Sequence, residues 1–242
     1  MILHRLLWRF ARHRDDPVFY AMQATDAIRW LRQRGVQVGP GLRVLDLGCG
    51  HGVFGGELAR LGCHVTFADE QNFLLPEHRS LPFIAVNLDR DDLGDLEAHD
   101  LVVCSNVLEH LAHPRRFLQI APRLVAPGGH LYLSWTNWLS PWGGHEFSPW
   151  HYLGPRIGPR IHDALGRRRF HSPGRNLFVT HIGVVLRWLR ADGLFQVRAM
   201  APRYYTEFPF LMRCPGLREV LAWNAALLLA RDHTAAGQAN KT

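Results

Sequence analysis

The chain has 242 residues and a formal net charge of +7, and 47% of its residues are hydrophobic and 20% charged. This length fits one α/β domain with a modest insert, and the composition excludes a disordered tail because enough apolar side chains are present to form a core. The charge is uneven: residues 35–149 carry seven Arg and thirteen acidic residues, whereas residues 150–190 carry eight Arg and one Asp. The acidic middle excludes a uniformly basic protein that coats nucleic acid.

Residues 1–35 are expected to form an N-terminal helical segment. The stretch 1–16 is apolar and Arg-rich, but it lacks the continuous apolar run and small-residue cleavage site of a signal peptide. It is expected to form either a cationic amphipathic helix on a membrane surface or a helix that packs on the domain or frays. Asp16 and Pro17 are typical of a helix start, and they predict a helix over residues 18–34.

Residues 36–136 alternate short apolar runs with helical patterns and are expected to form the core. Strands are expected over 43–47, 64–69, 83–86, 101–104 and 130–135, with helices over 53–61 and 114–125. This alternation predicts an α/β fold with a doubly wound, Rossmann-like parallel sheet that is covered by helices on both faces.

Residues 137–179 break this rhythm. They are rich in Gly, Pro, Trp, His and Arg, and the stretch is too long for an ordinary connection. Segments of this kind are more often functional than incidental, so we expect an irregular, acceptor-binding insert or lid after the fifth strand.

Residues 180–234 are expected to complete the core. A helix is predicted over 181–191 and a sixth strand over 194–200. A seventh strand has no clear place, and the apolar run 217–230 predicts a C-terminal helix that is too short to span a bilayer. The polar residues 235–242 are expected to be a disordered tail.

The four cysteines give no sign of a metal or redox motif. Cys49, Cys63, Cys104 and Cys214 form no C-x-x-C pair, which argues against a zinc knuckle and a thioredoxin-like site. They are expected to be small buried residues in a reducing, cytoplasmic setting.

The strongest motif is VLDLGCGHG, residues 44–52, directly after the first expected strand. A glycine-rich turn there lets a ligand approach the backbone and the following helix N-terminus. Residues 50–55 match the dinucleotide pattern G-x-G-x-x-G, whereas the pattern D-x-G-x-G-x-G from Asp46 is typical of S-adenosylmethionine binding. Asp69, which ends the second strand, suits two ribose hydroxyls in either case and therefore indicates an adenosyl ligand without choosing between them.

Further motifs decide between the two ligands. The chain carries FADE (67–70), VNLD (86–89), DLVVCSNVLEHL (100–111) and LVAPGGHLYLS (124–134). With VLDLGCGHG, these motifs resemble the class I S-adenosylmethionine-dependent methyltransferases over about residues 40–135. An NAD enzyme does not usually show V-L-E-H-L and P-G-G at this spacing.

A narrower resemblance covers the remaining chain. The segments NWLSPWGGHEFSPWHYLG (137–154), SPGRNLF (172–178) and FPFLMRCPGLREVLAWN (208–224) resemble a group of actinobacterial methyltransferases. Substrates of that group are largely unassigned, and some members are linked with cell-envelope lipids. This resemblance indicates natural-product or envelope-lipid metabolism.

The class I resemblance implies S-adenosyl-L-methionine as cofactor and assigns contacts residue by residue. Asp46, Gly48, Cys49 and Gly50 are expected to hold the amino-acid end of the cofactor, Cys49 through its backbone alone. Asp69 is expected to bind the ribose hydroxyls, and the adjacent Glu70 is also expected to contact the cofactor. Asn87 and Leu88 are expected to flank the adenine, and Ser105 and Asn106 to face the methionine portion and the methyl group. The family often has Asp where Asn87 stands, and the side-chain oxygen of Asn87 can still accept from the adenine amine.

The implied chemistry is an in-line displacement at a sulfonium methyl group, with a base to remove the acceptor's proton. His145, with Glu146 as orienting partner, and His151 are the catalytic candidates, although each histidine also has a structural interpretation as an anchor of its loop. The segment VLEHL (107–111) is expected to be helical, and His110 within it is expected to be structural. No metal is expected, because H-E-x-x-x-x-H from His145 does not match H-E-x-x-H.

Two side-chain groups in the insert bear on the acceptor. The aromatic group either walls an acceptor pocket or packs the insert onto the sheet, and it comprises Trp135, Trp138, Trp142, Phe147, Trp150 and Tyr152. The basic group either binds an anionic acceptor or membrane surface or is a solvated loop, and it comprises Arg156, Arg160, Arg167, Arg168, Arg169 and Arg175.

These observations favour O-methylation of a small-molecule, lipid or glycan acceptor, and the basic group of the insert leaves an anionic acceptor open. A methyltransferase of RNA or protein and a non-catalytic cofactor-binding module are the alternatives. Nucleic acid is the less favoured acceptor because the chain has no N-P-P-Y-like motif and its middle is acidic. A cytoplasmic protein with peripheral contact at the inner membrane face is expected, and the sequence leaves the oligomeric state open.

Overall fold

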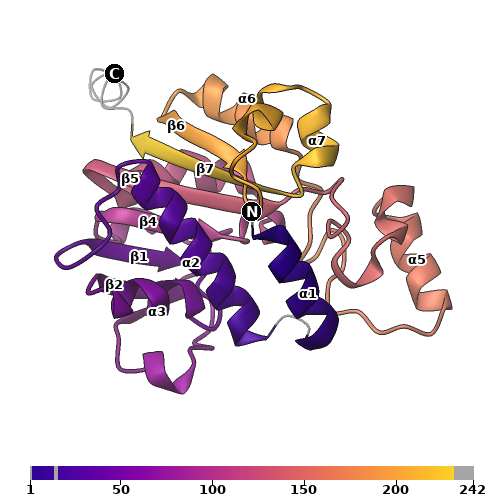
Figure 1. Ribbon diagram of the computed structural model, residues 1–242, viewed down its shortest axis with the longest axis horizontal. Coiled ribbons are helices and arrows are strands. Elements are labelled where there is room, and N and C mark those ends of the chain that lie inside the picture. The colour runs from indigo at the N-terminus through magenta and orange to yellow at the C-terminus, as the bar shows by residue number, and fades with distance from the viewer. Residues whose placement is uncertain (1, 14–15, 232–242) are drawn as a thin grey trace.

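The computed structural model describes residues 2–13 and 16–231, so the expected tail at 235–242 lies outside the described residues. One sheet of seven strands runs through the centre in the order β3-β2-β1-β4-β5-β7-β6 (Figure 1). The strands are β1 Arg43–Leu47, β2 His64–Asp69, β3 Phe83–Ala85, β4 His99–Ser105, β5 Val125–Thr136, β6 Phe195–Pro202 and β7 Asn224–Arg231. The first five are mutually parallel, and β7 runs antiparallel to both β5 and β6.

Helices cover the sheet and lead into the insert. They are α1 Leu3–His13, α2 Pro17–Gln33, α3 Val53–Arg60, α4 Pro114–Ile120, α5 Ile157–Ala164, α6 Ile182–Asp192 and α7 Leu217–Leu221. Short 3-10 turns are η1 Pro76–His78, η2 Leu93–Asp95, η3 Leu108–His110, η4 Ala121–Leu124, η5 His145–Phe147, η6 Trp150–Leu153 and η7 Pro209–Arg213.

Both faces of the sheet are buried, as the apolar strand sequences predict. On one face Leu45 of β1 belongs to a cluster that includes Phe117 of α4 and Val185 of α6. On the other face the neighbouring Val44 belongs to a cluster that includes Leu31 of α2. Successive residues of a strand therefore face opposite helical layers, which confirms the doubly wound α/β architecture.

The C-terminal part of the sheet differs from the expectation. The apolar run 217–230 was expected to be one helix, but only Leu217–Leu221 is helical and Asn224–Arg231 is a strand. This strand lies between β5 and β6, and residues 224–230 are buried along its whole length. A strand buried on both faces is uniformly apolar, so periodicity does not separate it from a helix. The expected parallel sheet is therefore mixed.

Two smaller expectations also change. The helix expected over 114–125 ends at Ile120, and a 3-10 turn follows, because Pro122 lacks an N–H and cannot continue an α-helix. The segment VLEHL forms the 3-10 turn η3 rather than a helix.

The insert after β5 lies to one side of the sheet, with α5 farthest from it (Figure 1). It has a small apolar core of Trp138, Phe147 and Leu177. The N-terminal helix meets it, since the Phe10 and Trp142 ring centroids are 6.2 Å apart. Within the described residues, every helix is too short or too polar to cross a membrane. All four cysteines are free.

Candidate functional site

A tight glycine turn connects β1 to α3. Gly48 and Gly52 have φ of 70° and 75°, in the left-handed region that side chains rarely adopt. A Cβ at Gly48 would lie 2.5 Å from Cγ2 of Val107, and one at Gly52 would lie 2.5 Å from Cδ2 of Leu74. Glycine is therefore required at both positions, and the turn presents bare backbone at the carboxyl end of β1.

Two carboxylates flank this turn. Oδ2 of Asp46 accepts a hydrogen bond from the backbone N–H of Gly55 at 2.8 Å, and its burial raises the pKa of this carboxyl to about 7. Asp69 accepts from the N–H groups of Gly50 and Glu70, each at 2.7 Å, through different oxygens. Asp69 thus ties the end of β2 to the glycine turn, and each of its oxygens keeps a further lone pair.

The ends of β2 and β3 are joined through side chains. Asn87 Nδ2 donates to Oε1 of Glu70 at 3.0 Å, and the side-chain oxygen of Asn87 accepts from the N–H of Asp89 at 3.0 Å. Leu88 is buried beside them, with 7% of its surface exposed. Polar side chains at the ends of β2 and β3 thus lie next to a buried apolar one.

After β4 the chain turns sharply at Asn106, whose φ is 58°. Its side-chain oxygen accepts from Nη1 of Arg203 and from Nδ2 of Asn224, both at 2.8 Å. Ser105 accepts from the hydroxyl of Ser134 at 3.2 Å. Both side chains therefore lock β4 to β5, β6 and β7. Arg203 and Asn224 were missed by sequence reasoning, because no local motif marks partners so far along the chain.

The residues expected at the cofactor thus gather on one edge of the sheet. They lie at the carboxyl ends of β1, β2, β3 and β4 or in the turns that follow: Asp46, Gly48, Cys49, Gly50, Asp69, Glu70, Asn87, Leu88, Ser105 and Asn106. Cys49 donates its backbone N–H to the carbonyl of Ala68 at 3.2 Å. In open α/β sheets, ligands bind beyond this edge.

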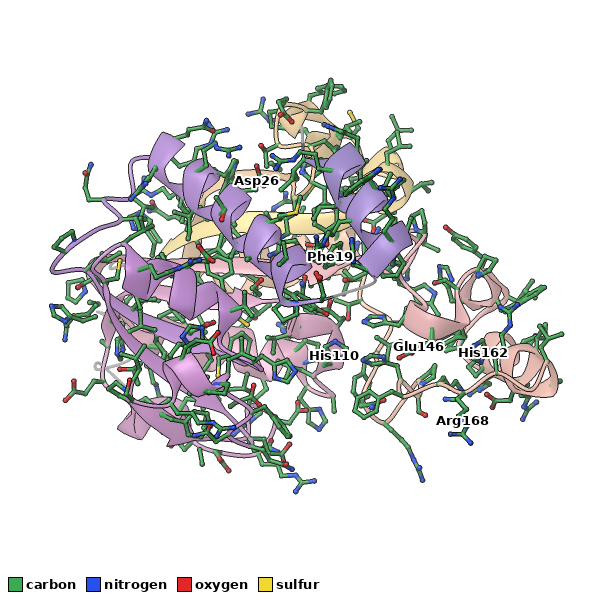
Figure 2. The ribbon with its side chains drawn as sticks, turned by 60° about the horizontal axis from the view of Figure 1, so that its bottom comes forward. Phe19, Asp26, His110, Glu146, His162 and Arg168 are labelled. Carbon is green, nitrogen blue, oxygen red and sulfur yellow. The ribbon has the colours of Figure 1, made fainter. Side chains whose placement is uncertain are left out.

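Next to this edge, three histidines from separate segments come together. One ring nitrogen each of His110, His145 and His171 lies within 4.8 Å of the other two. His110 belongs to η3, directly after β4, whereas His145 begins η5 and His171 follows α5. Figure 2 shows His110 at the side of the core that faces the insert carrying Glu146.

Glu146 pairs with a different histidine from the one that the sequence indicated. Glu146 contacts His171 rather than its neighbour His145, with 2.9 Å between Nδ1 of His171 and Oε1 of Glu146. Burial, reinforced by the adjacent His171 and His110, lowers the pKa of His145 to about 3, so its imidazole is neutral near pH 7. The sequence indicated a structural role for His110 and gave no individual role to His171, and both belong to this cluster.

His151 occupies a different environment. It is fully buried, and its Nε2 lies 2.9 Å from the carbonyl oxygen of Ser140. A Cβ at Gly144 would lie 2.5 Å from Cβ of His151, and the Trp138 ring centroid is 5.7 Å from that of His151. This position favours an anchor of the glycine-rich loop over a base that reaches an acceptor.

The aromatic and basic groups of the insert each contain some members that serve structure and others that remain exposed or partly exposed. Trp135, Trp138 and Phe147 are buried packing residues. Arg169 pairs with Asp163, with 2.9 Å between Nε and Oδ1. The exposed remainder of the basic group comprises Arg156, Arg160, Arg167, Arg168 and Arg175. Exposed apolar side chains interleave with these arginines: Leu153, Ile157, Leu165 and Phe170.

A Rossmann-like sheet whose first strand ends in a glycine turn, with an acid ending the second strand, is found in dinucleotide-binding and in S-adenosylmethionine-binding proteins alike. Similarity to known proteins identifies this chain as a class I S-adenosyl-L-methionine-dependent methyltransferase. Residues 12–166 match the family described as a methyltransferase domain, and the chain belongs to that family. The enzyme class expected from the motifs is confirmed, and S-adenosyl-L-methionine is the cofactor of this class.

Relatives that match most of the chain are also named as methyltransferases. A protein of Mycolicibacterium gilvum (strain PYR-GCK) named "uncharacterized methyltransferase" is 34% identical, covering 93% of this chain and 92% of the relative. One from Mycobacterium marinum (strain ATCC BAA-535 / M) is 33% identical over the same shares.

Solved structures share the fold. An S-adenosylmethionine-dependent methyltransferase from Mesorhizobium loti superposes with a TM-score of 0.57 at 21% identity, covering 86% of this chain and 98% of the other. A magnesium protoporphyrin IX methyltransferase from Synechocystis, solved with bound SAH, gives 0.54 at 18% identity, covering 89% and 86%.

Proposed function

We propose that this enzyme methylates a hydroxyl group of a small-molecule, lipid or glycan acceptor held between the cofactor edge and the insert. The observation that carries the proposal is the meeting of His110, which directly follows β4, with His145 and His171 of the insert. Polar imidazoles therefore converge where the carboxyl edge of the sheet meets the irregular segment. A few convergent polar groups in an otherwise apolar wall are typical of sites that fix a small substrate.

The cofactor edge suits S-adenosyl-L-methionine. When bound, this cofactor supplies an electrophilic methyl group on a positively charged sulfur. Asp46 would hold the ammonium group, because it is buried with the single backbone donor Gly55 and gains a counter-charge there. Asp69 would accept from the ribose hydroxyls with the lone pairs that its two backbone donors leave free.

The remaining assignments follow from their places on the same edge. Glu70 and Asn87, joined at 3.0 Å, and the buried Leu88 would flank the ribose and adenine. The backbone of Gly48, Cys49 and Gly50 would surround the methionine portion. Ser105 and Asn106 would face it through their backbone, because their side chains are already hydrogen-bonded within the protein.

At the acceptor, His145 and Glu146 keep a role and are joined by His110 and His171. Glu146 orients His171 through a 2.9 Å contact, and the neutral His145 offers a lone pair to a hydroxyl group rather than a proton. His151 instead holds the loop through the carbonyl of Ser140.

The surface of the insert supports an acceptor that is anionic or lies in a membrane. Exposed arginines such as Arg167 and Arg168 stand beside Phe170, which has 77% of its surface exposed. Basic side chains with interleaved apolar ones bind anionic lipid surfaces. Peripheral contact with the cytoplasmic face of the inner membrane and a place in envelope-lipid or natural-product metabolism are part of this proposal.

Transfer of label from S-adenosylmethionine tests the proposal. The full chain is incubated with methyl-labelled cofactor and a mycobacterial extract, which is then separated into organic-soluble, small-molecule, RNA and protein fractions. We expect the label in an O-methyl group of the organic-soluble or small-molecule fraction, and none with an Asp69→Ala control. Label in RNA or protein instead would show one of the alternative acceptors.

A further inference from the structure

The cluster of His110, His145 and His171 has the composition and surroundings of a cation site. The ring centroids of His145 and His171 are 4.2 Å apart, and that of His110 lies 5.3 Å and 5.1 Å from them. Packing three imidazoles this closely is unusual for residues that only fill space, because each ring carries polar nitrogens that burial leaves in need of partners.

Hydrogen bonds fix the tautomers of two of the rings. Nδ1 of His110 lies 2.7 Å from the carbonyl oxygen of Asn176, which can only accept, so Nδ1 carries the hydrogen. Nδ1 of His171 lies 2.9 Å from a carboxylate oxygen of Glu146 and donates in the same way. In the neutral rings this leaves a lone pair on each Nε2. A backbone carbonyl and a carboxylate behind the ligand are the usual outer partners of zinc-bound histidines.

The third ring is held there at a conformational cost. His145 has φ of 49°, in the left-handed region that non-glycine residues seldom occupy, and such strain gathers at binding sites. Its Nδ1 is buried and has no hydrogen-bond partner among the described residues. A cation bound between the three rings would give this buried nitrogen a partner.

We propose that His110, His145 and His171 bind one divalent transition-metal ion of the zinc type. The three donor nitrogens lie within 4.8 Å of one another, and tetrahedral zinc–nitrogen bonds of about 2.0–2.1 Å require them to come up to about 1.5 Å closer. Imidazole donors suit zinc, copper, iron and nickel, whereas magnesium and calcium prefer oxygen. Three protein ligands leave a fourth position open, as in catalytic zinc sites.

This inference departs from the expectation that no metal binds. The sequence pattern around His145 offered no helical zinc motif, and the two other ligands lie 35 positions before it and 26 after it. The ion-binding claim stands on these histidines alone. With the ion bound, the lone pair of His145 goes to the metal, and the acceptor hydroxyl is held at the open coordination position instead. Only this use of the ion rests on the proposed function.

Cobalt(II) titration of the metal-free full chain tests the site, because tetrahedral cobalt absorbs visibly where zinc does not. We expect one equivalent of cobalt per chain, displaced by zinc, with no sulfur-to-metal charge-transfer band. His171→Gln and His145→Gln should each weaken binding by more than the about 10- to 100-fold expected for Glu146→Gln, which removes an outer partner. His64→Gln, an exposed histidine on β2, is the matched control and should bind as the wild type does.

Three results would overturn the inference: no tetrahedral cobalt spectrum in the wild type, equal binding by His171→Gln, or a spectrum with thiolate bands. The wild-type spectrum decides the matter even where a variant fails to fold. Calorimetry with S-adenosylmethionine on the same samples keeps the two proposals apart. Cofactor binding without cobalt binding would contradict only the ion site. Cobalt binding by a protein that methylates RNA would contradict only the proposed acceptor.

Discussion

The carboxylate of Asp46 accepts a 2.8 Å hydrogen bond from the backbone N–H of Gly55, and this contact joins the end of β1 to the first turn of α3. The carboxylate is buried, and among the described residues it has this one backbone donor, with Asp69 nearby. A buried acid with so few donors favours its neutral form until a cation arrives. Cofactor binding and the protonation of Asp46 should therefore be linked.

The affinity for S-adenosylmethionine should rise with pH across neutrality. Burial raises the pKa of Asp46 from 3.8 to about 7, so below pH 7 the site must release a proton before it holds an ammonium group. We expect affinity to fall up to tenfold per pH unit below 7 and to level off above 8. Calorimetry in buffers of different ionisation enthalpy measures the released proton.

The same pKa shift has the opposite sign for folding. A raised carboxyl pKa stabilises the folded state fully below the unfolded value of 3.8, and this contribution is lost as pH rises through about 7. Asp46→Asn should make both the affinity and the stability less dependent on pH in this window. An affinity profile that is flat from pH 6 to 8 in the wild type would contradict the assignment.

Gly55→Ala should disturb the same contact. A Cβ there would lie 2.4 Å from Cε1 of Phe67 and 2.9 Å from Oδ2 of Asp46, both inside the core. Overpacking of this kind costs about 1–3 kcal/mol, which exceeds the roughly 1 kcal/mol that alanine gains over glycine in a helix. We expect lower unfolding free energy and weaker cofactor binding.

Gly39→Ala is the control, since no atom lies within 4 Å of its added Cβ. Urea denaturation should show a change within about 0.5 kcal/mol for Gly39→Ala. If Gly55→Ala were as stable as this control and bound the cofactor equally well, the contact between Asp46 and Gly55 would contribute neither to stability nor to cofactor binding.

The cofactor edge was predictable because its signal is local. The turn from Asp46 to Gly52, and the acid Asp69 that ends the next strand, are short motifs whose backbone requirements can be read from residue types. Parallel strands then bring their carboxyl ends to one edge, so the motifs assemble without knowledge of distant contacts.

The remaining features depend on distant pairing. Glu146 pairs with His171 rather than His145, and Asn106 binds Arg203 and Asn224, although no spacing in the sequence marks these partners. The strand β7 was missed for a related reason, since its buried position between two strands removes the alternation that identifies a strand.

Gly143→Ala should separate the insert from the cofactor edge. A Cβ at Gly143 would lie 1.8 Å from the carbonyl oxygen of Trp138, so the loop that carries His145 cannot keep its path. We expect S-adenosylmethionine affinity to stay near that of the wild type, while methyl transfer falls at least about tenfold, which corresponds to about 1.4 kcal/mol. Calorimetry and a label-transfer assay measure the two effects. Unchanged transfer would show that the insert does not form the acceptor site.

The exposed arginines of the insert should govern contact with lipid. Replacing Arg167 and Arg168 by Ser removes about 1 kcal/mol each on an anionic surface, so vesicle binding should weaken about 30-fold. Sedimentation with vesicles of anionic and of neutral phospholipid, at low and high salt, measures this change. Arg198→Ser, an exposed arginine on the edge strand β6, serves as control. Equal binding to neutral and anionic vesicles would show that the arginines do not direct the protein to an anionic surface.

Asp69 and the glycine turn are expected to hold S-adenosylmethionine, and calorimetry on two proteins with two ligands measures this. Wild-type protein and Asp69→Ala are titrated with S-adenosylmethionine and with NAD. We predict one S-adenosylmethionine per wild-type chain, little binding of NAD, and an affinity at least about 100-fold lower in Asp69→Ala, because hydrogen bonds to a charged acceptor contribute about 1.5–3 kcal/mol each. Equal affinity of the variant would contradict the role of Asp69 in binding the cofactor. Tighter binding of NAD by the wild type would contradict S-adenosylmethionine as the cofactor.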